Sequence, residues 1–454
     1  MHASIAPNVT VPRESVLKKG FVILLLALAV IVLVSPALVG RLAEESMDEN
    51  LDWAATESRD LTITSQGFER GWFSSEGQHR VELRDGDVRD ALLLVAVNTD
   101  FDGLPALVID THIDHGLVAV TSMARERGTL LPGLGSAVST MRLEFENGET
   151  VDIPGTIYSE VGLSGELQSN FILEPGTFSN AGETAQWGNV DMLITTSPST
   201  DIIGFGGDID EIAFVSSNSE VTIGPLRFEG DQRKTRFGPY IGDAAFTIDK
   251  ITMPSSFGQD SMGPIAFTST VAIDDSALSG RTTVLLDDLP FGDLGRARIS
   301  MDISADDIDA EAIGNLTHAL DGLSDDASDD EVRLAVEDDL KQLLAAGFEL
   351  RVAELDVSLQ PGTISARLNA EVDDTDLDSF VWTSALLALD ATLDVSVPAE
   401  LMDYLISLDP QVGAAVGMGF LRRNQDAYEM EATFKDGLLT INGAPMPVPW
   451  LSGN

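Results

Sequence analysis

Alternation of apolar and polar residues with a period of two dominates the chain beyond residue 60 and predicts a structure built mostly from β-strands. Successive side chains of such a stretch point to opposite faces, and only one face is apolar, which is typical of antiparallel strands covered on one side. Gly- and Asp-containing turns separate the stretches. The predicted strands are 61–65, 79–85, 107–113, 140–148, 220–230, 244–253, 269–274, 296–304, 363–372 and 391–398.

Helical spacing of apolar residues appears only in the last third of the chain. Two stretches, 297–320 and 391–408, share the order strand, turn, amphipathic helix, which would fold each helix back onto a sheet face. The expected fold class is therefore α+β, predominantly antiparallel β: an elongated β-rich body with a few packed helices. The predicted helices are Asp306–Leu323, Asp329–Ala346, the ten residues after Pro398, and Pro410–Arg423.

An apolar run near the N-terminus predicts one transmembrane helix. Residues 21–39 carry no charge and would span about 28 Å as a helix, close to the hydrocarbon thickness of a bilayer. Lys18 and Lys19 precede the run and acidic residues follow it, so the positive-inside rule places the N-terminus in the cytoplasm. A cleaved signal peptide is the alternative, because small residues occur at 35–37, but the run is long for a signal peptide.

The expected organisation follows from this anchor. The protein would be a single-pass membrane protein that contacts the bilayer through residues 21–39, with its bulk on the non-cytoplasmic side. The predicted regions are a cytoplasmic N-terminus (1–20), a transmembrane anchor (21–40), a β-rich external region (41–290) and an α+β external region (291–454).

Charge excludes one class of partner. The chain has 74 acidic and 27 basic residues, a formal net charge of −47, and such a surface repels nucleic acid. Only six residues are lysine. An acidic, lysine-poor surface stays soluble in concentrated salt, which favours a saline compartment over an ordinary acidic protein. Cysteine is absent, which excludes disulfides and thiolate catalysis.

The stretch Thr-His-Ile-Asp-His-Gly, residues 111–116, resembles part of a metal-hydrolase motif. On a strand, His112 and Asp114 would share one face, and Ile113 and His115 the other. A catalytic zinc needs further ligands, yet the chain has five histidines in all and the motif's second histidine is missing. We therefore interpret His115 as a structural residue at a strand end before Gly116, and expect no metal and no cofactor.

Sparse motifs carry a family resemblance. Residues 67–83 (GFERGWFSSEGQHRVEL) contain Gly71, Trp72 and Phe73 between two strands, the pair His115-Gly116 follows a later strand, and the pair Asn442-Gly443 lies near the C-terminus. Together with the anchor, these features resemble the YdgA-like bacterial envelope family of unknown function. The resemblance implies an inner-membrane anchor, a periplasmic β-rich body and no established reaction.

Two of these motifs have local interpretations of their own. The pair Trp72-Phe73 is either a buried plug of a turn or a contact surface for a partner or lipid, because aromatic side chains contribute strongly in both settings. The sequence INGAP, which contains Asn442-Gly443, predicts a tight hairpin between two C-terminal strands.

Three functions remain open. The leading hypothesis is non-enzymatic binding of an envelope protein or a hydrophobic or lipid ligand along the apolar sheet face. The first alternative is a periplasmic hydrolase using a carboxylate pair, although no pair can be singled out among so many acids. The second is an envelope scaffold that assembles into homo-oligomers through a sheet edge.

Overall fold

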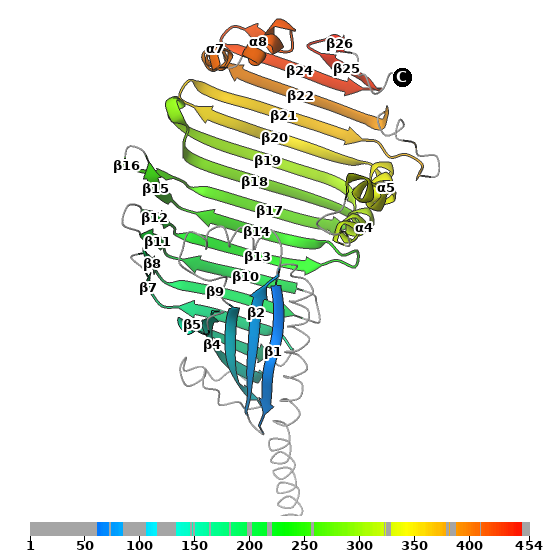
Figure 1. Cartoon of the computed structure of the whole chain (residues 1–454). Coiled ribbons are helices and arrows are strands. Elements are labelled where there is room, and N and C mark those ends of the chain that lie inside the picture. The colour runs from blue at the N-terminus through cyan, green and yellow to red at the C-terminus, as the bar shows by residue number, and fades with distance from the viewer. Residues whose placement is uncertain are drawn as a thin grey trace, which may run out of the picture. The chain divides into compact units, whose positions relative to one another are not determined.

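The computed structural model describes residues 61–71, 74–84, 106–115, 133–145, 148, 150–162, 165–180, 183–197, 202–215, 220–255, 258–321, 323, 328–377, 381, 387–408 and 410–446. The chain divides into two compact units, Met1–Leu173 and Glu174–Asn454. Among the described residues, antiparallel β-strands are the main element of each unit (Figure 1).

The first unit is an antiparallel meander in which each strand pairs with the next. Its interior mixes apolar side chains such as Val108 and Ile113 with buried polar ones. The hydroxyls of Thr111 and Ser139 lie 2.8 Å apart, so each satisfies the other. The strands are β1 (Leu61–Arg70), β2 (Ser74–Leu83), β3 (Ala106–His115), β4 (Gly133–Glu144), β5 (Thr150–Gly162) and β6 (Leu167–Leu173).

The second unit is organised around a long antiparallel sheet, the main sheet. A short strand, β23 (Arg422–Asn424), pairs with β24 on the side where β25 also pairs. In order of pairing, the other strands are β9 (Val190–Ser197), β10 (Ile202–Ile209), β13 (Leu226–Lys234), β14 (Tyr240–Ile248), β17 (Ile265–Asp274), β18 (Ala277–Pro290), β19 (Arg296–Asp309), β20 (Phe348–Leu359), β21 (Gly362–Val372), β22 (Leu389–Pro398), β24 (Ala427–Lys435), β25 (Leu438–Ile441) and β26 (Ala444–Met446).

A second, smaller sheet continues the first strands of the main sheet. Five times, a strand of one sheet continues into a strand of the other through a bend of two residues. These continuations are β8 to β9, β10 to β11, β12 to β13, β14 to β15 and β16 to β17. In order of pairing, this sheet contains β7 (Gly176–Asn180), β8 (Glu183–Trp187), β11 (Ile212–Val215), β12 (Glu220–Ile223), β15 (Ile251–Ser255) and β16 (Gly258–Met262).

Glycine alternates with aspartate at these bends. Gly224 donates its N–H to the carbonyl of Lys250 at 3.0 Å, and Asp249 donates to the carbonyl of Pro225 at 2.8 Å. The bends at Gly188 and Gly263 make the same kind of reciprocal backbone bonds. Gly224 has φ +129, a region that residues with a side chain rarely adopt.

The helices of the described part pack at opposite ends of the strands. Strands β19 and β22 run in opposite directions, because two strands separate them in an antiparallel sheet, and a helix follows each directly. As a result α4 and α5 lie at one end of the strands and α7 and α8 at the other (Figure 1). These helices are α4 (Ala310–Asp321), α5 (Asp329–Ala346), α7 (Ala399–Leu408) and α8 (Pro410–Gly417), with a 3-10 turn, η1, at Gly292–Leu294.

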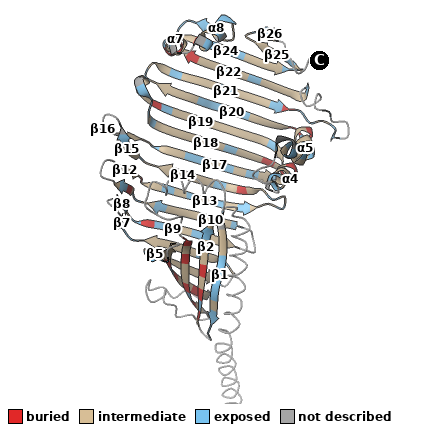
Figure 2. Cartoon of the chain, in the orientation of Figure 1, coloured by how far each residue is buried: buried red, intermediate tan, exposed pale blue. Residues whose placement is uncertain are grey.

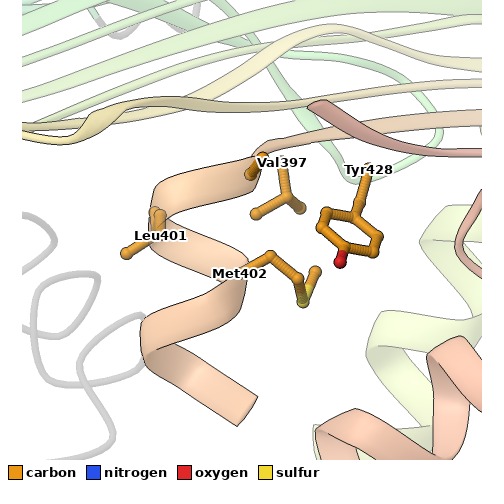
Figure 3. Packing of buried hydrophobic residues seen from close by; sticks show 5 residues of the cluster. Val397, Leu401, Met402 and Tyr428 are labelled. Atoms are coloured by element: carbon orange, nitrogen blue, oxygen red, sulfur yellow. The ribbon is translucent and has the colours of Figure 1, made fainter. Parts of the chain in front are cut away.

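Buried apolar side chains anchor each helix pair to the sheet. Met402 of α7 lies beside Val397 of β22 and Tyr428 of β24 (Figure 3), and Leu401 belongs to the same buried cluster. At the other end of the strands, Ala310 at the start of α4 forms a second buried cluster with Ile241 and Leu278 of the main sheet. The two strand-turn-helix stretches predicted from sequence therefore both fold a helix back onto the sheet.

Most predicted elements are confirmed, with three corrections. Helices α5 and α7 have the predicted bounds, whereas α4 begins only at Ala310, because β19 continues to Asp309. The predicted strands 220–230 and 244–253 are wrong as single strands: each is divided by a bend into strands of different sheets. The predicted helix Pro410–Arg423 is also too long, since α8 ends at Gly417 and β23 follows.

The predicted anchor, residues 21–39, lies outside the described residues. Within the described ranges, no helix is both long and apolar enough to cross a bilayer. The predicted regions 41–290 and 291–454 meet between β18 and β19, which pair along most of their length.

One arginine ties the second sheet to the main sheet. Arg296 donates from Nη1 to Asp260 of β16 at 2.5 Å and from Nε to Asp288 of β18 at 2.8 Å. It also donates to the carbonyls of Ser261 and Asp288. Hydrogen bonds from Arg296 are the main reason that the pKa values of Asp260 and Asp288 are lowered.

Replacing Gly224 by alanine should destabilise the second unit. A Cβ at this position would lie 2.8 Å from the carbonyl oxygen of Asp210 and would meet a positive φ, a strain of about 1–3 kcal/mol. Chemical denaturation of the full chain measures the loss. Gly280→Ala is the control, because a Cβ there makes only ordinary contacts at 3.7 Å. Equal losses in the two variants would contradict the role given to the bend.

Replacing Arg296 by glutamine should lower the thermal unfolding temperature, and the loss should depend on pH. Carboxylates with a lowered folded-state pKa stabilise the fold above their unfolded pKa of about 3.9, and this stabilisation is lost as pH falls through the folded value. The difference between wild type and Arg296→Gln should thus be largest near neutral pH and shrink below about pH 4. Arg298→Gln, which removes one contact at 3.2 Å to Asp287, is the control. A pH-independent difference would refute the ion-pair explanation.

Candidate functional site

Cross-strand register gathers apolar side chains into two continuous rows on one face of the main sheet. Directly paired residues of antiparallel strands point to the same face, so each row can be followed from strand to strand. We call these two rows together the apolar band. The first row is Val190, Ile209, Leu226, Ile248, Ile265, Leu286, Ile299, Val357 and Ile364; the second is Met192, Gly207, Phe228, Phe246, Phe267, Val284, Met301, Leu355, Ala366, Val395 and Met430.

On the band face of β10 and β13, glycines lie opposite aromatic residues. A Cβ on Gly207 would lie 2.8 Å from the ring of its partner Phe228, and a Cβ on Gly230 would lie 2.6 Å from the ring of its partner Phe205. Each ring therefore covers the glycine opposite it. The two rings are 6.4 Å apart and tilted by 30°. Side chains at either glycine would displace the rings.

The apolar band is largely uncovered. Val190 is its only buried member; Phe267 is 38% exposed and Leu355 36% exposed, and the others are half-buried. Figure 2 shows the same pattern, with few buried residues on the main sheet. Large apolar surfaces left in contact with water are unusual for a soluble monomer and are typical of binding surfaces.

The helices of the described part leave the middle of the band open. Ile364 and Val395, near the band's β24 end, contact the buried cluster around α7. The cluster around α4 includes Val271 and Ile273 but no residue of the band. Band residues from Leu226 to Leu355 belong to neither cluster.

A repeat in the sequence generates the first half of the band. Gly188, Gly224 and Gly263 lie 36 and 39 residues apart, and Asp210, Asp249 and Asp287 lie 39 and 38 apart. In every copy, the second and fourth residues after the glycine belong to the band, as do the first and third residues before the aspartate. This repeat was not among the sequence predictions, although the spacing of its Gly-Pro and Ile-Asp pairs marks it in the sequence.

The opposite face of the same strands is polar and hollowed. A cavity of about 720 Å³ lies over Gly204 and Gly206. Its lining includes the carboxylates of Glu229, Asp231 and Asp243, and the last two are direct cross-strand partners. A carboxylate pair is the arrangement required by the hydrolase hypothesis.

Hydrolysis by such a pair also needs an acid with a raised pKa. The pKa values of Asp260, Asp288, Asp302 and Glu331 are lowered. Hydrogen bonds cause every one of these shifts: an arginine donates to each aspartate, and Ser328 donates to Glu331. None of these groups lines the cavity.

Gly71 and His115 of the first unit lie at one end of its sheet. Gly71 donates its N–H to the carbonyl of Ser74 at 2.7 Å and closes the turn between β1 and β2. Ser74 pairs with Asp114, so this turn and His115, the last residue of β3, lie at the same end. Trp72, Phe73, Gly116 and the side chain of His115 lie outside the described residues.

His112 and Asp114 share a face, as predicted, with Glu76 opposite. The ring of His112 is 3.5 Å from Asp114 and 3.7 Å from Glu76 and is 46% exposed. Within the described ranges, no group of three or more histidine, aspartate and glutamate side chains could hold a metal ion. The arrangement is a surface contact between an imidazole and two carboxylates.

Asn442 and Gly443 form the predicted tight hairpin between β25 and β26, with positive φ at both residues. The Asn442 side chain donates to the carbonyls of Gly419 and Phe420 at 3.0 Å. Its oxygen accepts from the N–H of Glu431 at 2.9 Å. Asn442 therefore holds the segment after α8 against β24, which is a structural role.

Truncating a band residue should cost little stability. Phe246→Ala should cost far less than the about 3–5 kcal/mol typical of a buried phenylalanine, whereas Leu401→Ala, at a residue 1% exposed, should cost about 2–5 kcal/mol. Denaturant titration of both full-chain variants gives the two values. A loss of about 3 kcal/mol or more for Phe246→Ala would mean that the band is covered in solution.

Comparison with known proteins adds a family. A family model described as bacterial protein of unknown function (DUF945) matches residues 17–449. No curated protein and no solved structure matches the chain. The family match covers most of both units and every residue of the apolar band, and the chain therefore belongs to this bacterial family of unknown function.

Proposed function

We propose that this chain is a non-enzymatic, single-pass protein of the bacterial inner membrane whose periplasmic second unit binds the hydrocarbon chains of lipids on the apolar band. The observation that carries the proposal is the continuous pair of apolar rows left uncovered by the helices of the described part. Residues 21–39 would provide the membrane anchor, and the resemblance to the YdgA-like envelope family supports this location.

The dimensions of the band suit a hydrocarbon chain. Strands are about 4.8 Å apart, so the second row is about 48 Å long, while the two rows are only about 7 Å apart along the strands. Each methylene removed from water contributes up to about 0.8 kcal/mol. A chain lying across the strands would bury one side of each methylene and gain part of this contribution along its whole length, without needing a polar partner.

A second copy of the protein suits the band less well. Such a narrow strip has an area on the order of 500 Å², below the about 800 Å² per partner of a standard interface. Polar residues also interrupt the next row of the same face, at Ser269 and Thr282, which pair directly. The net charge of −47 repels a second copy, whereas it does not act on an uncharged hydrocarbon.

The hydrolase alternative rests on the cavity beside Glu229, Asp231 and Asp243. Among the described residues, its lining lacks a histidine or arginine that would stabilise developing negative charge. Asp231 and Asp243 are both exposed, in contrast to the desolvated acid that such chemistry uses. The apolar band therefore favours lipid binding over hydrolysis.

Photo-crosslinking at adjacent positions tests the proposal. Benzoylphenylalanine would replace Phe246 in one full-chain variant and Thr247 in another, because these neighbours point to opposite faces of β14. In intact membranes, irradiation should attach lipid at position 246, and much less at position 247. Mass spectrometry of the labelled peptide identifies the adduct.

The other outcomes of this experiment decide between the hypotheses. Equal labelling at 246 and 247, or none at 246, would refute lipid binding on the band. A crosslink from 246 to a second copy of the chain would instead support the self-assembling scaffold.

A further inference from the structure

We infer that the lipid capacity of the band is set by the number of bent hairpins in the second unit, each of which adds one interchangeable segment. The inference rests on the proposed function, since it concerns how much hydrocarbon the same surface holds.

Each hairpin adds the same set of side chains to the band. In the middle copy, Leu226 and Phe228 follow the glycine bend, and Phe246 and Ile248 precede the aspartate bend. The next copy supplies Ile265, Phe267, Val284 and Leu286 at the corresponding positions. One hairpin thus extends both rows by two strands, about 10 Å.

Successive hairpins also interlock in the same way. A Cβ on Gly224 would meet the carbonyl oxygen of Asp210, in the previous hairpin, at 2.8 Å. A Cβ on Gly263 would meet the carbonyl oxygen of Asp249, again in the previous hairpin, at 2.6 Å. These two glycine bends therefore fit closely against the preceding aspartate bends. Because the contact is repeated, removing one hairpin would bring the next against the same kind of bend.

Excision of one repeat follows directly from this geometry. Deleting residues 225–263 joins Gly224 to Pro264, which preserves the Gly-Pro bend and lets β17 take the place of β13 beside β10. Deleting residues 250–287 joins Asp249 to Asp288 and removes a different pair of main-sheet strands. Tandem duplication of residues 225–263 makes the opposite change and lengthens the band by two strands. Residues 225–263 contain Ile241 and residues 250–287 contain Leu278, so each deletion also removes one buried residue of the cluster around α4.

A photoactivatable, clickable palmitic acid analogue provides the measurement. Each full-chain variant is reconstituted in phosphatidylcholine vesicles containing the probe, irradiated, and digested, and label on peptides from the main sheet is counted per protein. Label should fall to about 0.8 of wild type in either deletion and rise to about 1.2 in the duplication, in proportion to the number of strands in the band.

A matched control separates band length from sheet length. In a second duplication, the four band residues of the added copy are replaced by threonine, which adds strands without apolar surface. Its label should equal that of wild type. If the label on the threonine variant rises as much as in the apolar duplication, the inference is wrong.

The remaining outcomes separate this inference from the proposed function. Absence of label in wild type would refute lipid binding itself. Folded variants that all label as wild type does would refute the capacity rule alone, because lipid would then occupy one local site. Circular dichroism reports folding, and failure of all three length variants to fold would show that the hairpins are not interchangeable.

Discussion

Register between neighbouring strands is the constraint on which the second unit depends. Side chains alternate between faces with a period of two, so a slip of one residue at any hairpin would move apolar residues of that strand to the polar face. The bends oppose such a slip. Gly224 donates a backbone hydrogen bond to Lys250, next to Asp249, and Asp249 donates one to Pro225, next to Gly224. The next glycine, Gly263, fits against the carbonyl of Asp249. The rows of the band stay continuous because these contacts recur.

The sequence predicted the elements of this fold better than their arrangement. Alternation identified strands such as 363–372, and the helical spacing after Pro398 identified α7, because both patterns record which residues share a face. The bends were missed because 220–230 was read as one strand, although its alternation changes phase at Gly224-Pro225, between Ile223 and Leu226. The same patterns could not reveal what covers the apolar face, which depends on where the few helices pack.

The candidate site was predicted only in outline. An apolar sheet face for a hydrophobic ligand was expected, but its residues were not identified, because leucine, isoleucine, valine and phenylalanine replace one another in the repeat and obscure it. The motif residues have backbone roles where they are described: Gly71 closes a turn and Asn442 closes a hairpin. Such residues are recognisable from sequence because few other residue types fit their conformations.

Dependence on near neighbours in sequence has a consequence for folding. Nearly every strand of the main sheet between β17 and β22 pairs with the strand that precedes or follows it in the chain, so few contacts have to wait for distant segments. Sheet proteins usually fold slowly because their pairings close long loops. Here a hairpin can form as soon as its two strands have been synthesised, and the sheet can grow strand by strand in the direction in which the chain emerges.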